Sequence, residues 1–202
     1  MVQQKQAESR NETLLKRGLR LEYTTLLWNV AGVFITAIAA FKASSIAIGG
    51  FGLDSLVEIG ASMIVVKELT RKDEHEHGNA IKLLGIGFLA ISIYILLQAT
   101  YLLVRGVHPD TSVLGIIWTG LTLIAMLLLA YGKHHTGRKL NNPVLLTEGR
   151  VTLVDAYLAG AILLGLSLNA IFSWWWADPA ASLVIVFYGI KEGRAALHES
   201  NK

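Results

Sequence analysis

Residues 44–66, SSIAIGGFGLDSLVEIGASMIVV, decide the fold class of this chain. The stretch is long and apolar enough to cross a bilayer as a helix, yet Asp54 and Glu58 lie near its middle. Side chains four residues apart project from the same face of a helix. An ionised Asp at a bilayer centre costs about 2.5–3.5 kcal/mol. Both acids are therefore expected to face a protein interior, a water path or a bound cation.

Composition places the rest of the chain in the membrane as well. Of its 202 residues, 53% are hydrophobic and 16% are charged, whereas a typical soluble domain has about 25% charged residues. The mean hydropathy is +0.50. The chain contains no cysteine, which excludes disulfides and thiolate metal sites. We therefore predict an all-α integral membrane protein whose surroundings are the lipid bilayer.

Uncharged runs predict a bundle of six transmembrane helices, since a span needs about 20 apolar residues. Residues 1–20 are expected to form a cytoplasmic tail that becomes helical near residues 13–20. Residues 21–193 form the membrane domain, and residues 194–202 form a short C-terminal tail. The expected spans are residues 23–41, 45–66, 81–104, 111–132, 145–168 and 174–190.

The connections between the spans predict the orientation. Lys and Arg gather in the N-terminal tail, in the loop after the second span, in a predicted polar loop at 133–143 that begins with Lys133, and near the C-terminus. On the opposite side the sequence has only Lys42 and Arg105. The positive-inside rule therefore predicts that both termini are cytoplasmic, in the plasma (inner) membrane if the protein is bacterial. A further turn is predicted within residues 169–179, between the last two spans.

A third acid is expected to join the pair in the second span. Asp155 lies in the fifth span at a depth similar to that of Asp54, and Glu58 lies one turn nearer the cytoplasm, level with Val151. If the two spans are neighbours, three carboxylates share one pocket. Oxygen ligands suit divalent cations such as zinc, manganese, iron or cobalt. Because protons compete for the same oxygens, such a site would exchange a metal ion for protons.

Other polar residues are weaker candidates for contact with a metal ion. Glu148 shares a helix face with Asp155 near the cytoplasmic end, where it is either an interfacial charge or an access site for the ion. His75 and His77, in the loop after the second span, suit metal capture or are merely solvated. Asn29 in the first span is a further polar candidate.

An alternative interpretation of Asp54 and Glu58 is a structural polar cluster, hydrogen-bonded to Asn29, Gln98 or threonine side chains. The sequence contains no HExxH, Walker or GxSxG motif, so we expect neither an enzyme nor a permanently bound cofactor. The spans lack histidine, which gives an intramembrane metalloenzyme little support. Basic residues lie at the membrane edges, so nucleic acid is not an expected partner.

With these acids in place, the chain resembles the cation diffusion facilitator family. The segment from Asp54 to Glu58 is similar to the family's D-x-x-x-D helix, and His77-Gly78 is similar to its H-G motif. EGRVTLVD, ending at Asp155, resembles the fifth-span pattern of an acid, a His or Asp, and an Asp four residues later, and WWADP resembles the start of the sixth span. The resemblance implies six spans, cytoplasmic termini, a homodimer and divalent metal/proton antiport by alternating access.

The chain departs from the family pattern in three respects. Val151 stands where the pattern has His or Asp, Glu58 replaces an Asp, and the usual cytoplasmic C-terminal domain is expected to be missing. Zinc favours nitrogen and sulfur donors, whereas three carboxylates with water or Asn29 suit manganese, iron or cobalt equally. A dimer would then depend on the membrane spans.

Two functional hypotheses follow. The first is a secondary transporter that exports a divalent metal from the cytoplasm against protons, with Asp54, Glu58 and Asp155 as the binding residues. The second is a transport-inactive membrane protein that binds metal as a sensor or assembly subunit. Metal flux separates the two, because a sensor binds the ion without moving it.

Overall fold

A computed structural model describes residues 2–70 and 77–199 of the chain. Within these ranges the chain forms helices joined by short connections, without a β-strand. The helices are α1 (Val2–Ala43), α2 (Ile46–Thr70), α3 (His77–Arg105), α4 (Val113–Leu140), α5 (Pro143–Phe172) and α6 (Ala177–Glu199). The fold class predicted from the apolar runs is confirmed.

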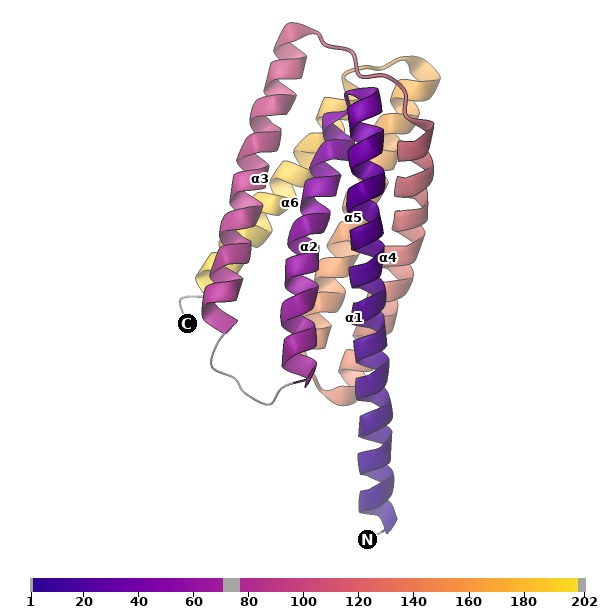
Figure 1. Ribbon diagram of the computed structural model, residues 1–202, viewed down its shortest axis with the longest axis vertical. Coiled ribbons are helices and arrows are strands. Elements are labelled where there is room, and N and C mark those ends of the chain that lie inside the picture. Colours follow the sequence, from indigo (N-terminus) through magenta and orange to yellow (C-terminus); the bar gives the residue numbers. More distant parts are fainter. Residues whose placement is uncertain (1, 71–76, 200–202) are drawn as a thin grey trace.

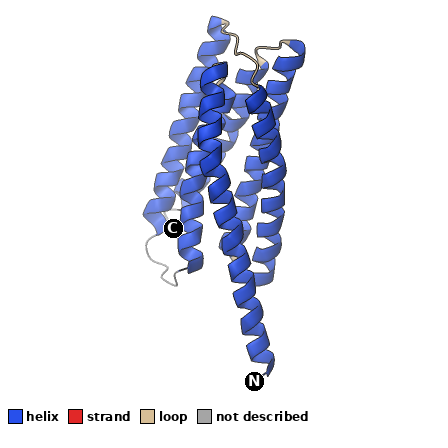
Figure 2. Ribbon diagram, turned by 45° about the vertical axis from the view of Figure 1, so that its right-hand side comes forward, coloured by secondary structure: helices blue, strands red, loops and turns tan. Residues whose placement is uncertain are grey.

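The helices run alternately up and down, as Figure 1 shows. α4 packs against α5 and α1, α1 also packs against α2, and α3 pairs with α6 beside this group. The starts of α3 and α5 and the ends of α2, α4 and α6 share one end of the bundle, beyond which the first part of α1 projects (Figure 1). We call this the terminal end, and the opposite end the far end. The far end carries the connections drawn as tan loops in Figure 2.

Five of the described helices are long and apolar enough to cross a membrane by length and composition, namely α1 to α5. α6 does not meet the same criterion, because Lys191, Glu192 and Arg194 interrupt its second half. α6 nevertheless runs alongside α3 through the bundle (Figure 1).

Two predicted boundaries differ from the structure. α1 is continuous from Val2, so the helix extends well before residues 13–20, because the polar segment contains neither Gly nor Pro before Gly18 and is rich in good helix formers. The polar loop predicted at 133–143 is wrong, since α4 continues to Leu140 and only Asn141 and Asn142 connect it to α5. Asn141 has a left-handed backbone (φ 49°), and Asn142 caps α5 by accepting from the Leu145 amide.

The main apolar core lies towards the far end. Ala39, Phe51, Ile95, Ile162 and Ile185 are among its buried members and come from α1, α2, α3, α5 and α6. Nearby, Asp178 at the start of α6 accepts hydrogen bonds from the Ser45 hydroxyl at 2.7 and 2.8 Å. The apolar core and this polar contact together fasten the far end of the bundle.

Candidate metal site

The acids of α2 and α5 meet inside the bundle, nearer the terminal end than the apolar core. Asp54, Glu58 and Asp155 are only 5%, 3% and 3% exposed. All three line one cavity, together with Val151 and residues of α3 and α6. The convergence expected from their positions in the two spans is therefore present in the structure.

The cavity is small, and its lining combines acidic with apolar side chains. Its volume of ≈ 10 Å³ is near the lower limit for a single water molecule. Its described lining contains the acids of α2 and α5, a further acid, Glu192 of α6, and no basic side chain. Such a surface attracts cations and repels anions.

Two oxygen atoms in this lining have no hydrogen-bond partner among the described residues. They are Oε2 of Glu58 and Oδ2 of Asp155. Because a buried polar atom is normally paired, each of these atoms needs a proton, a water molecule or a cation. As placed, however, no three described His, Asp or Glu side chains form a group that could hold a metal ion.

The remaining candidates lie in different places. Asn29 of α1 is buried, its Nδ2 has no partner, and it is absent from the described lining of the cavity. His75 lies outside the described residues. His77 is the first residue of α3, and its side chain is likewise not described.

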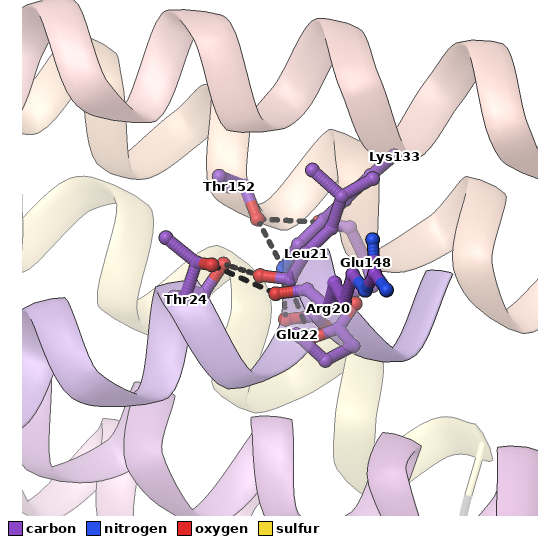
Figure 3. A network of polar contacts seen from close by, with 8 residues as sticks. Arg20, Leu21, Glu22, Thr24, Lys133, Glu148 and Thr152 are labelled. Atoms are coloured by element: carbon purple, nitrogen blue, oxygen red, sulfur yellow. Dashed lines mark hydrogen bonds and ion pairs between the residues drawn. The ribbon is translucent and has the colours of Figure 1, made fainter. Parts of the chain in front are cut away.

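Glu148 belongs to a polar network centred on Lys133. The Lys133 ammonium donates to Glu22 Oε2 at 3.0 Å, to Glu148 Oε1 at 3.2 Å and to Thr152 Oγ1 at 3.0 Å. Figure 3 shows these side chains pointing towards one another from α1, α4 and α5. Lys133 is 0% exposed, so its assignment to a solvated loop was wrong.

This Lys133 network lies next to the small cavity that Asp54, Glu58 and Asp155 line. The charges of Lys133 and Glu148 act on both Glu58 and Asp155. The donors of Lys133 are already engaged by acceptors outside the cavity lining.

Sequence reasoning missed Lys133, Glu22 and Glu192. A signal for Lys133 was present, since Met126, Leu129 and Lys133 follow the three- and four-residue spacing of a buried helix face. Glu192 likewise follows Ile185 and Gly189, which are buried, at the spacing of one face of α6. Lys133 was assigned to a polar loop because it is charged, whereas Glu22 and Glu192 lay just outside the predicted spans and were not considered.

A family profile for the cation efflux transmembrane domain matches residues 79–201, which is more than half of the chain. The chain belongs to the cation efflux family, also called the cation diffusion facilitator family. With its apolar helices, this cation efflux protein is an integral, multi-pass membrane protein. The matched segment includes Asp155 and Glu192, while Asp54 and Glu58 precede it.

A relative of this cation efflux protein is a cadmium, cobalt and zinc/H(+)-K(+) antiporter of Bacillus velezensis. The two are 26% identical over 176 residues, which cover 80% of this chain and 55% of the relative. The chain therefore spans about half the length of this relative.

Proposed function

We propose that this protein is a secondary transporter that exports a divalent transition-metal ion in exchange for protons. The observation that carries the proposal is the single buried cavity shared by Asp54, Glu58 and Asp155. Membership of the cation efflux family supports metal efflux, and transport rather than catalysis, as the general function. The relative named above is described as an antiporter of cadmium, cobalt and zinc, which supports the exchange mechanism.

The chemistry of the cavity favours exchange over simple passage. Three ionised carboxylates in a space this small would repel one another strongly. In the absence of metal they are stable only when protons are shared among them, and an arriving divalent cation displaces those protons. Metal and proton therefore occupy the same oxygens in alternation, so that binding one releases the other.

We further propose that the described conformation admits the ion from the terminal end. A wider cavity of ≈ 400 Å³, lined by Arg150 and Lys191, adjoins the acidic cavity between α5 and α6 near that end. The apolar core separates the acids from the far end. With the orientation predicted from Lys and Arg, the terminal end is cytoplasmic and release requires the apolar core to part.

Zinc and cobalt are the first metals to test, because both are in the relative's name. Manganese and iron remain candidates on the donor set alone. The homodimer expected from the family resemblance stays a prediction.

The decisive experiment is metal-driven proton flux in proteoliposomes. Asp54→Asn keeps the size of the side chain but removes the charge, and it is expected to abolish Zn²⁺-dependent proton movement while the protein remains folded. Glu12→Gln, which changes an exposed acid paired with Lys16, is the control and should transport like the wild type. Wild-type flux in Asp54→Asn would exclude the proposed mechanism. Zn²⁺ binding without flux in the wild type would instead favour the sensor hypothesis.

A further inference from the structure

α6 contributes its own carboxylate to the cavity that contains the acids of α2 and α5. Tyr188, Gly189 and Glu192 all line this cavity, and residues three and four apart share one face of a helix. We propose that Glu192 is a ligand of the transported cation, so that α2, α5 and α6 each contribute a ligand to the binding site. This inference rests on the function proposed above.

The position of Glu192 between two cavities is the first reason. The wider cavity between α5 and α6 and the small acidic cavity share Val151, Val154 and Glu192 in their linings. Of these shared residues, Glu192 alone is charged. A cation that moves from the wide cavity towards Asp54 therefore passes this carboxylate.

The donors available across the cavity are the second reason. On α5, Asp155 is the carboxylate that lines the small cavity, whereas Val151, one turn earlier, offers no donor atom. Glu192 supplies a carboxylate from α6 to the same cavity lining as Val151. The charge of Glu192 acts on Asp54. A divalent cation held by the α2 acids thus has a third helix from which to take an oxygen ligand.

The unpaired oxygens of Glu58 and Asp155 are the third and independent reason. Both side chains are more than nine-tenths buried, both line the small cavity, and each leaves one oxygen without a described partner. Lys133 is held by Glu22 and Glu148 and donates no hydrogen bond to these oxygens. A cation in the small cavity would satisfy the free oxygens of both residues and lie against Glu192.

The test is calorimetric titration of the purified full chain with Zn²⁺ and separately with Mn²⁺, without other ligands. Glu192→Gln removes the charge at nearly constant size and should raise the Kd for both metals at least about ten-fold, since even residues that only support a ligand cost 10–100-fold. Glu192→His exchanges oxygen for nitrogen and should increase the preference for Zn²⁺ over Mn²⁺. Glu12→Gln, the surface control, should leave both values unchanged.

The outcomes separate this inference from the proposed function. If Asp54→Asn loses Zn²⁺ binding while Glu192→Gln retains the wild-type Kd, the ligand role of Glu192 is overturned and the proposed function stands. If Asp54→Asn retains wild-type Zn²⁺ binding, the proposed function itself is overturned, whatever Glu192→Gln does. An unchanged Zn²⁺/Mn²⁺ preference in Glu192→His would also overturn the ligand role, because a merely structural residue would affect both metals equally. If Glu192→Gln does not fold, Glu192→Asp decides: a wild-type Kd overturns the role, and a raised Kd supports it.

Discussion

The Lys133 ammonium of α4 lies 3.2 Å from the Glu148 carboxylate of α5, in an interior from which solvent is excluded. A second carboxylate, from Glu22 of α1, lies 3.0 Å from the same nitrogen. With the Thr152 hydroxyl as third acceptor, each proton of the ammonium group has a partner. This one side chain therefore joins three helices at the terminal end of the bundle.

Removing the Lys133 charge is expected to destabilise the protein severely. Lys133→Met would leave the carboxylates of Glu22 and Glu148 buried without a counter-charge, which costs about 3–5 kcal/mol for a broken buried pair. The free energy of unfolding is measured by SDS titration in detergent with tryptophan fluorescence. Adding Glu22→Gln and Glu148→Gln to the same variant should recover much of the loss. If Lys133→Met alone is as stable as the wild type, the Lys133 network does not contribute to the free energy of unfolding.

The packing of α3 on α6 predicts a contrast between two helical glycines. A Cβ at Gly193 would lie 2.9 Å from Leu89 Cγ and 3.0 Å from the Gly85 carbonyl oxygen, whereas a Cβ at Gly120 would meet nothing closer than 4.0 Å. Gly193→Ala should therefore destabilise the protein by roughly 1–3 kcal/mol, because the backbone of α3 must move. Gly120→Ala should be neutral or stabilising, since Ala is favoured in helices. Thermal unfolding of both variants in detergent compares them, and equal Tm values would contradict the close packing.

Metal binding is expected to strengthen as the pH rises. Low pH protonates the cavity carboxylates and so opposes the metal, and Kd should fall about ten-fold per pH unit for each proton displaced. Asp155→Asn removes one titrating group, so the pH dependence should become shallower by about one proton. Calorimetry with Zn²⁺ in buffers of different ionisation enthalpy counts the released protons. A Kd independent of pH in the wild type would argue against shared oxygens.

A nitrogen donor placed at Val151 should shift the metal preference towards zinc. Val151→His adds an imidazole to the lining of the small cavity, and zinc favours such a ligand more than manganese does. Leu153→His is the matched control, because Leu153 lines the wider cavity but not the small one. Competition between Zn²⁺ and Mn²⁺ measures the preference. Equal behaviour of the two variants would place position 151 away from the bound ion.

The apolar runs were sufficient to predict the helices and the last turn, because the length of a span and the charges that end it are local properties. The turn predicted within residues 169–179 is present between Phe172 and Ala177. The convergence of Asp54 and Asp155 was also predictable, since their depth in each span follows from residue counting. That prediction needed only the assumption that the two spans are neighbours.

Lys133 and Glu192 show where sequence reasoning fails. Lys133 was placed in a polar loop and Glu192 lay beyond the last predicted span, although Lys133 is buried and Glu192 lines the acidic cavity. Whether a charge at such a position is buried depends on a partner from a distant segment, such as Glu22 for Lys133. The order in which helices pack is set by contacts between many residues far apart in the chain, and no local pattern encodes it.

The apolar core at the far end also determines where a membrane voltage would act. The wide cavity near the terminal end is large enough to hold water and ions. Once it is filled, little of the potential falls there, whereas the packed segment around Phe51 and Ile162 is insulating. A charge carried across the whole potential gains or loses about 2.3 kcal/mol per 100 mV. In the proposed cycle, binding at the acids is therefore nearly voltage-independent. The step in which the apolar core parts and the bound ion gains access to the far end is the electrogenic one whenever the exchanged charges do not balance.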